Sequence, residues 1–267
     1  MSRAQALVLR TAGTNCDGET VEALRLAGAE SQRVHLHRVL DEPARLDDVS
    51  LLVLPGGFSY GDDVAAGRVL GLELRHHLRS ALDAFVARGG YVLGVCNGFQ
   101  VLIETGLFDT ETDAGTTTRD VALTDNASDR FECRWVTLRE EDSACSWLSA
   151  GELLPCPAAH AEGRFVVRDT ATLELLRARG QIALRYVTPE GGPASYPDNP
   201  NGSVDDIAGL CDPTGRVLGL MPHPERNVTP WHHPQWTRRQ AQGSPPREGE
   251  GLSFWRRLVE AAACVPV

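Results

Sequence analysis

The sequence predicts an α/β protein with a mixed, mostly parallel β-sheet and helices on both faces of that sheet. In the first half of the chain, short apolar runs alternate with segments of helical periodicity, which is the order of strand–helix–strand units. These runs are continuously apolar, as expected for parallel strands buried on both faces. The 267 residues are predicted to form a single domain over residues 1–267, with an irregular insertion at about 228–251.

The first half of the chain contains four predicted strands and three predicted helices. The strands are the apolar runs at residues 5–10, 34–40, 49–58 and 91–96. The helices are the periodic segments at residues 18–30, 71–88 and 97–108. In the first helix Val21, Leu24 and Ala27 recur at helical spacing, and glycines lie at or near the end of all three helices.

The second half changes to shorter β-type segments, separated by Gly, Pro, Asn and Asp. Predicted strands that extend the sheet lie at residues 130–138, 164–169, 181–187 and 216–222. A long loop at 188–206 is rich in turn residues, and such loops are either functional or mobile. A second irregular run at 229–251 precedes a last helix, in which Leu252, Trp255, Leu258 and Val259 share one face and are predicted to pack on the core.

Composition excludes several classes of protein. A formal net charge of −10 repels phosphate backbones, so we expect no nucleic-acid partner. No apolar run approaches the roughly 20 residues of a membrane helix, and the first residues do not resemble a signal peptide, so we expect no membrane partner and a cytoplasmic location. The seven cysteines are odd in number and form no CxxC pair, which predicts reduced thiols without a disulfide framework or a metal site.

The chain contains no lysine, because all 26 basic residues are arginine. A phosphate-binding P-loop needs a lysine that reaches the phosphates, so this chain has none. Schiff-base chemistry on a lysine amine is excluded for the same reason. If the protein takes part in ATP-driven chemistry, another chain is expected to bind the nucleotide.

The segment YVLGVCNGFQ has the order strand, Gly-x-Cys-x-Gly, helix, which is the shape of a nucleophile elbow. Gly94 and Gly98 allow the sharp turn to close around Cys96. The turn would hold the thiol at the carboxyl end of the sheet and at a helix N-terminus, where thiolate is favoured. We therefore predict that Cys96 is a nucleophile. The other six cysteines lack this context and are predicted to be structural.

A reactive thiol needs a base, and His223 in the segment GLMPHPERNV is the predicted one. Pro224 disfavours a helical backbone at His223, and in an extended chain residues two apart point to the same side. Glu225 is therefore expected to lie beside the imidazole and to orient it. His35, His37, His76, His77, His232 and His233 are predicted to be solvated or packed without a catalytic role.

Acyl transfer also needs backbone N–H groups aimed at the developing oxyanion. The residue after an elbow nucleophile supplies one of them, here Asn97. The second is expected from the glycine-rich segment VLPGGFSYGDD, with Gly57 as the candidate, because a glycine lets the backbone approach a ligand closely.

At this point the motifs resemble a known family. LPGGFSYGDD, GVCNGFQ and MPHPER are similar to segments of the class I, or triad, glutamine amidotransferases, which have a flavodoxin-like fold. RTAGTNCDGET, NASDRFECRWV, AHAEGRF and YPDNPNGS resemble, within that class, the glutaminase subunits of phosphoribosylformylglycinamidine synthase in purine biosynthesis. The likeness extends over roughly residues 5–227.

The resemblance implies a role for each matched residue. Cys96 would attack the side-chain amide of glutamine, the amides of Gly57 and Asn97 would hold the oxyanion, and His223, oriented by Glu225, would transfer protons. Gln100 matches a position that helps to hold the substrate glutamine.

The resemblance also implies that the ammonia passes to a large synthetase subunit, which a small third subunit usually joins. That synthetase converts formylglycinamide ribonucleotide to the amidine with ATP and Mg²⁺. No cofactor is therefore expected in this chain.

Some features depart from the family pattern or leave alternatives open. AHAEGRF has Ala161 where a glycine is usual, and this segment, with His160 and Glu162, is expected either to face the synthetase or the ammonia exit or to be a structural loop. The run from Trp231 to Gly251 is longer than expected and could be a lid, an interface or an insertion.

The alternative functions are a glutaminase for another synthetase, a cysteine-elbow hydrolase or chaperone of the same fold, and a binding subunit with an inactive site.

Overall fold

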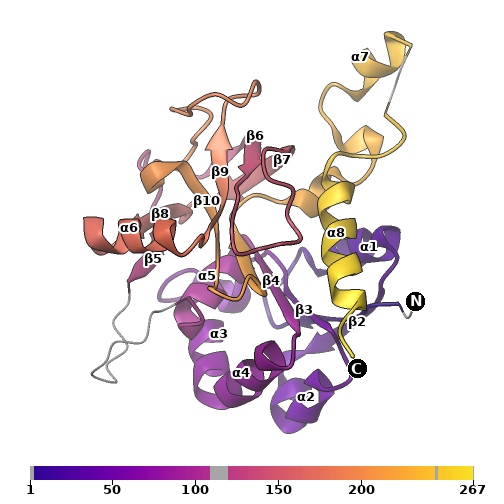
Figure 1. Ribbon diagram of the computed structural model, residues 1–267, viewed down its shortest axis with the longest axis vertical. Helices are drawn as coiled ribbons and strands as arrows, with labels where there is room; N and C mark the ends of the chain where they lie inside the picture. Colours follow the sequence, from indigo (N-terminus) through magenta and orange to yellow (C-terminus); the bar gives the residue numbers. More distant parts are fainter. Residues whose placement is uncertain (1–2, 109–119, 244–245, 267) are drawn as a thin grey trace.

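A computed structural model describes residues 3–108, 120–243 and 246–266. Its centre is a nine-stranded sheet with the order β2-β1-β3-β4-β11-β10-β9-β6-β7 (Figure 1). The strands in chain order are β1 (Gln5–Arg10), β2 (Glu30–His35), β3 (Leu51–Leu54), β4 (Tyr91–Val95), β6 (Glu132–Glu140), β7 (Leu153–His160), β9 (Ile182–Val187), β10 (Ile207–Cys211) and β11 (Val217–Leu220).

Half of the sheet is parallel and half is antiparallel. Strands β2, β1, β3, β4 and β11 pair in parallel, whereas β11, β10, β9, β6 and β7 pair antiparallel. The mixed sheet of the prediction is therefore confirmed. One predicted member was wrong: the segment at 164–169 forms β8 (Arg164–Val167), which pairs with β5 (Val121–Thr124) in a two-stranded sheet separate from the nine-stranded one.

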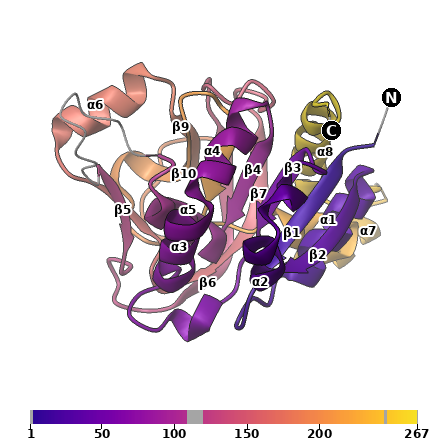
Figure 2. The same cartoon turned by 90° about the horizontal axis from the view of Figure 1, so that it is seen from below.

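Helices cover both faces of the sheet, as predicted (Figure 2). On one face lie α1 (Asp17–Ala27) and α8 (Gly251–Ala263), which pack against each other. On the other lie α3 (Arg68–Glu73), α4 (Arg79–Ala87) and α5 (Asn97–Thr105). The apolar face predicted for the last helix is confirmed, because Leu252, Trp255, Leu258 and Val259 are all buried.

Two predicted elements in the first half differ from the structure. The predicted strand at 34–40 is the end of β2 followed by a short helix, α2 (Leu36–Asp41). Its buried residues, Leu36 and Val39, are three apart, which is a helical and not a strand spacing. The helix predicted at 71–88 is α3 and α4 joined by a π-helical turn at Leu74–Leu78.

The segment predicted as an irregular insertion at 228–251 contains some regular structure. A 3₁₀ turn at Pro230–His232 and the short helix α7 (Trp236–Ala241) lie in it, while residues 244–245 are outside the described part. In Figure 1, α7 lies beyond the end of α8, away from the sheet. Helix α6 (Thr170–Ala178), with Asp169 as its N-cap, was not predicted. Among the described helices, none is long and apolar enough to cross a membrane.

Candidate active site

Cys96 lies in the turn between β4 and α5 and has an unusual backbone conformation, with φ 52° and ψ −108°. Small neighbours make this turn possible. A Cβ atom on Gly98 would lie 1.9 Å from the carbonyl oxygen of Leu54, and one on Gly94 would lie 2.6 Å from the carbonyl oxygen of Gly98. The structure thus has the predicted elbow, with the thiol at the carboxyl end of β4 and the N-terminus of α5.

His223 comes close to Cys96 because it follows β11, which is the neighbour of β4 in the sheet. Strand β11 pairs with β4 in parallel, with Gly219 opposite Gly94 and Leu220 opposite Val95, and the backbone N–H of Cys96 donates to the carbonyl oxygen of Leu220 at 2.8 Å. Parallel neighbours end at the same edge of a sheet. Two residues 127 positions apart in sequence therefore meet, and both line one surface pocket.

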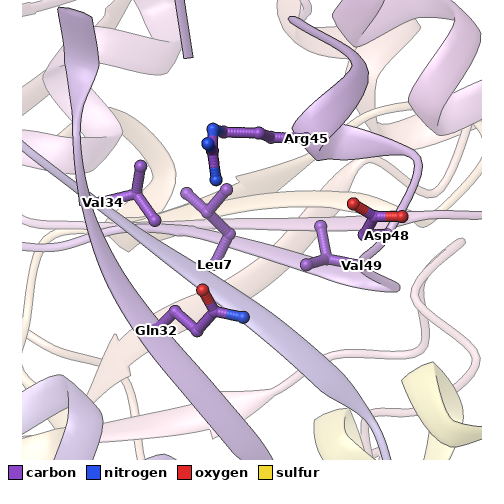
Figure 3. Close-up of a pocket in the computed structure, with 6 residues that line it drawn as sticks. All are labelled: Leu7, Gln32, Val34, Arg45, Asp48 and Val49. Carbon is purple, nitrogen blue, oxygen red and sulfur yellow. The ribbon is translucent and has the colours of Figure 1, made fainter. Parts of the chain in front are cut away.

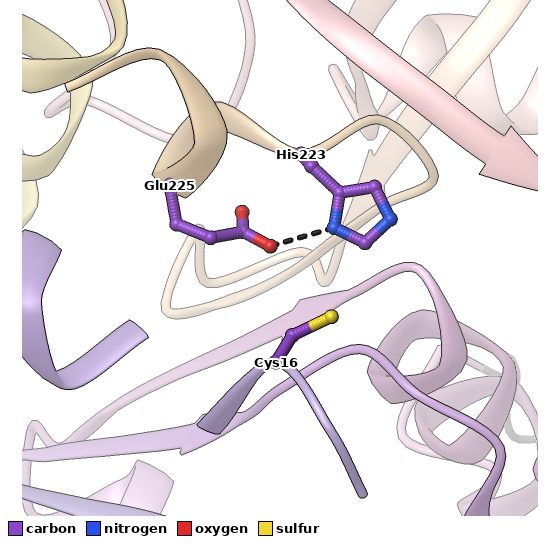
Figure 4. Close-up of side chains that lie close together, drawn as sticks. All are labelled: Cys16, His223 and Glu225. Carbon is purple, nitrogen blue, oxygen red and sulfur yellow. Dashed lines mark hydrogen bonds and ion pairs between the residues drawn. The ribbon is translucent and has the colours of Figure 1, made fainter. Parts of the chain in front are cut away.

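The imidazole of His223 is paired with Glu225. Nδ1 of His223 lies 2.6 Å from Oε1 of Glu225, and both side chains are buried (Figure 4). The predicted reason for this pairing needs a correction. His223 is close to extended, with φ −111° and ψ 85°, but Glu225 belongs to a 3₁₀ turn at Pro224–Asn227. The turn, rather than a continuing extended chain, brings the carboxylate to the ring.

The electrostatics of this pair favour a protonated imidazole. Burial by itself disfavours the charged form of His223, but the Glu225 carboxylate and the neighbouring Cys96 and Cys16 thiols outweigh it, so the pKa of His223 is raised well above its ordinary value. An imidazolium beside a thiol stabilises the thiolate and holds a proton that a leaving group can take.

Gly57 and Asn97, the residues predicted to form an oxyanion hole, both lie next to Cys96. Gly57 has φ +144°, a conformation that a residue with a side chain rarely adopts, and a Cβ atom there would lie within 2.9 Å of backbone atoms of residues 13–15. Asn97 is the first residue of α5, so its N–H has no partner within the helix. Gly57 lines the same pocket as Cys96.

The side chains of Asn97 and Gln100 hold the loop around the site together. Oδ1 of Asn97 accepts from the N–H of Ser59 at 3.0 Å, and its Nδ2 donates to Asp62 at 3.0 Å and to Gln100 at 2.9 Å. Nε2 of Gln100 donates to the carbonyl oxygen of Glu162. Both the oxygen and the nitrogen of the Gln100 amide are therefore hydrogen-bonded within the protein. Gln100 lines a second pocket beside Cys96, together with Ala159, His160, Ala161 and Glu162.

His160 adds a neutral imidazole to the wall of this second pocket. Burial, with a smaller effect of the charge on His223, lowers the pKa of His160 to about 4. Its Nδ1 lies 3.1 Å from Oδ1 of Asn126, which also accepts from the N–H of Gly163. Nδ1 therefore carries the proton, and the buried Nε2 has no hydrogen-bond partner among the described residues.

Cys16 is a site residue that was not predicted. Its sulfur lies next to His223, and the Arg226 guanidinium donates to it at 3.2 Å. Burial raises the pKa of its thiol, while His223 lowers it. One signal in the sequence could have found it, because the segment GTNCD follows β1, a parallel strand whose carboxyl end lies at the same edge of the sheet as that of β4.

A different pocket lies away from these groups, between β1, β2 and the segment before β3. Figure 3 shows the six residues that line it, which are Leu7, Gln32, Val34, Arg45, Asp48 and Val49. It contains neither a thiol nor an imidazole, so we do not assign the chemistry to it.

Comparison with known proteins agrees with this geometry. Residues 3–262 match the family model of the CobB/CobQ-like glutamine amidotransferase domain. A solved glutamine amidotransferase from Thermotoga maritima has a TM-score of 0.55 at 15% identity and covers 99% of this chain and 100% of its own, which shows the fold alone. The fold and the family match define a class I glutamine amidotransferase domain with a flavodoxin-like fold.

Relatives of higher sequence identity show which family within this class the chain belongs to. The phosphoribosylformylglycinamidine synthase subunit PurQ of Dehalococcoides mccartyi is 40% identical over 98% of this chain and 99% of its own length. The same subunit of Treponema denticola is 44% identical over 84% of this chain and 88% of its own. The structure of PurLQS from Thermotoga maritima has a TM-score of 0.71 at 32% identity and covers 97% of this chain and 99% of the matched chain. This chain belongs to the PurQ family.

Proposed function

We propose that this protein is the glutaminase subunit of phosphoribosylformylglycinamidine synthase and releases ammonia from glutamine for that enzyme. One observation carries the proposal: a chain of the PurQ family has an elbow cysteine, Cys96, that lines one pocket with His223, whose buried imidazole is paired with Glu225. A binding subunit with an inactive site would not need these three groups to be assembled.

The reaction follows from the positions of the groups. The thiolate of Cys96 attacks the side-chain amide carbon of glutamine, which forms a carbon–sulfur bond and puts a negative charge on the amide oxygen. The amides of Gly57 and Asn97 stabilise that charge. When the intermediate collapses, the imidazolium of His223 gives its proton to the departing nitrogen, and ammonia leaves. His223 then takes a proton from water, whose oxygen attacks the thioester, and glutamate and the free thiol are released.

The ammonia is consumed by a partner. A large synthetase subunit would use ATP and Mg²⁺ to convert formylglycinamide ribonucleotide to formylglycinamidine ribonucleotide, and a small third subunit would join the complex. The absence of lysine from this chain is consistent with that division, since its own residues cannot form a P-loop. No cofactor is then needed here, and the location would be the cytoplasm. Gln100 would position the substrate from the second pocket.

Two measurements test the proposal. A glutamine analogue with an electrophilic carbon in place of the amide should label Cys96, and Cys96→Ser should abolish ammonia release while Cys133→Ser, at an exposed position, retains it. Affinity purification from the source cell should recover a large ATP-using synthetase, and the recovered complex should form the amidine. Recovery of a different glutamine-dependent synthetase would support the alternative that another enzyme receives the ammonia.

A further inference from the structure

Two carboxylates face the second pocket beside Cys96. Asp62 and Glu162 both line this pocket, and both side chains are partly buried. Oδ1 of Asp62 accepts from Nδ2 of Asn97 at 3.0 Å, and Oε2 of Glu162 accepts from the N–H of Ala66 at 3.3 Å. Because Asp62 and Ala66 belong to one short loop, which the Glu162 side chain contacts, the two carboxylates lie on the same wall of the pocket.

No positive charge of the protein balances these carboxylates. The pocket is lined by no arginine, the chain has no lysine, and neither Asp62 nor Glu162 forms an ion pair with a described residue. Burial, with a smaller effect of the charge on Glu162, raises the pKa of Asp62. Charges that are removed from water are normally paired, so this wall is suited to a cationic group of a ligand.

A third polar group in the same pocket also lacks a partner. His160 lines the pocket and is 3% exposed, and its ring is neutral because burial lowers its pKa to about 4. Nδ1 carries the proton and faces Asn126, so Nε2 can only accept a hydrogen bond, and it has no partner among the described residues. A buried acceptor without a donor is costly, so we expect a bound group that donates hydrogen bonds here.

Glutamine carries one group with both of these properties. Its α-ammonium is positively charged and has three N–H donors and no acceptor, like the ammonium of a lysine side chain. It lies at the opposite end of the molecule from the amide carbon that the thiolate attacks. Since Cys96 lines the same pocket as the two carboxylates, one substrate molecule can reach both the sulfur and the acidic wall.

We propose that Asp62 and Glu162, with Nε2 of His160 as a further acceptor, bind the α-ammonium group of the substrate glutamine and make the enzyme specific for an α-amino acid amide. This inference rests on the proposed function. It gives the segment AHAEGRF a part in substrate recognition, where the sequence suggested the synthetase interface, the ammonia exit or a structural loop. A recognition role, unlike a role in holding the loop, depends on whether the ligand has an ammonium group, and this dependence can be measured.

The first test compares glutamine with 4-carbamoylbutanoate, which is glutamine without its α-amino group. The wild type should prefer glutamine by about 10²-fold or more in kcat/KM for ammonia release. In Glu162→Gln and in Asp62→Asn this preference should fall by about tenfold, chiefly through a higher KM for glutamine. Asp63→Asn, at an exposed neighbouring position outside the pocket, is the matched control and should keep the preference. Equal losses on the two amides in Glu162→Gln and Asp62→Asn, with the preference unchanged, would overturn the proposal.

The second test needs no substitution and so does not depend on a variant that folds. Two chloroketone analogues of glutamine, one with the α-amino group and one without it, are compared by mass spectrometry for their rate of labelling Cys96. Each rate is divided by the rate of the same reagent with a free thiol in solution. The reagent with the amino group should label Cys96 at least about tenfold faster.

The outcomes of this labelling separate the two proposals. Equal normalised rates would contradict the ammonium site, while labelling of Cys96 by both reagents would still support the glutaminase function. Labelling by neither reagent, together with no release of ammonia from glutamine, would overturn the proposed function and this inference with it.

Discussion

Nδ1 of His223 lies 2.6 Å from Oε1 of Glu225, and neither side chain is exposed to solvent. This hydrogen bond occupies Nδ1 and leaves Nε2 available for proton transfer. It is also the contact through which the carboxylate raises the pKa of the imidazole.

Replacement of Glu225 by glutamine keeps the shape of the side chain and removes its charge. The pKa of His223 should fall, and kcat for ammonia release should drop by about 10²–10⁴-fold, the size of the effect when a general base loses its orienting carboxylate. The limb of the pH–rate profile that reports His223 should move to lower pH. Glu174→Gln, at an exposed position on α6, is the matched control, and an unchanged profile in Glu225→Gln would contradict the assignment.

Gly56 leaves space for the imidazole. A Cβ atom at Gly56 would lie 2.8 Å from Cε1 of His223, so Gly56→Ala should push the ring from its place. A displacement of about 1 Å in an active site can cost on the order of 10²-fold in rate, and we expect ammonia release to fall by that amount while the circular dichroism spectrum is retained. Gly18→Ala is the control, since nothing lies within 4 Å of its added methyl group. Similar rates in the two variants would argue against this placement of His223.

His160 should make the protein less stable in acid. Its pKa in the folded state is about 4 and the ordinary value is 6.5, so the unfolded chain binds the proton first as the pH falls. The stability of the fold with a neutral His160 is fully present above about pH 6.5 and is lost progressively as the pH falls towards 4. Between pH 7.5 and pH 5 the loss is about 2 kcal/mol.

His160→Gln removes this titration. In urea unfolding at the two pH values, the variant should lose about 2 kcal/mol less than the wild type, whereas His76→Gln, at an exposed position, should behave as the wild type. Equal losses in His160→Gln and the wild type would mean that His160 is not held neutral by burial.

Asn201 anchors the long loop at 188–206, which the sequence predicted to be either functional or mobile. Its Nδ2 donates to the carbonyl oxygen of Gly163 at 2.8 Å and to the hydroxyl of Tyr186 at 3.2 Å, and its Oδ1 accepts from the N–H and the hydroxyl of Ser203. Asn201→Ala removes these buried hydrogen bonds, although the Ser203 N–H keeps its bond to Asn199, and should lower the free energy of unfolding by about 3 kcal/mol. Ser195→Ala in the same loop, at an exposed position, should change it little; a similar small change in Asn201→Ala would show that the anchor contributes little.

The parts of the fold that could be predicted are those with a local signal. The elbow at Cys96 could be predicted from the five residues 94–98 alone, because the turn itself needs Gly94 and Gly98. The apolar face of α8 follows from helical spacing. The pairing of His223 with Glu225 was also predicted, although the 3₁₀ turn that produces it was not, since proline is compatible with both an extended chain and the first turn of a helix.

The parts that could not be predicted depend on contacts between distant segments. Cys16 has no local feature that separates it from a structural cysteine, and only the parallel alignment of β1 and β4 in the same sheet brings it to His223. β8 has the composition of a sheet strand, but its partner is β5 and not the main sheet. The side chain of Gln100 is engaged by Asn97 and Glu162, which spacing along α5 does not reveal.

The direct pairing of β4 with β11 has an evolutionary consequence. Nucleophile and base are separated by a long stretch of chain, yet their distance is set by one register, with Gly94 opposite Gly219. A slip of two residues in that ladder would carry the imidazole about 7 Å along the sheet and disable the enzyme. Lineages should therefore be free to lengthen, shorten or replace the segments between these strands, provided that the alignment of this single pair is inherited unchanged.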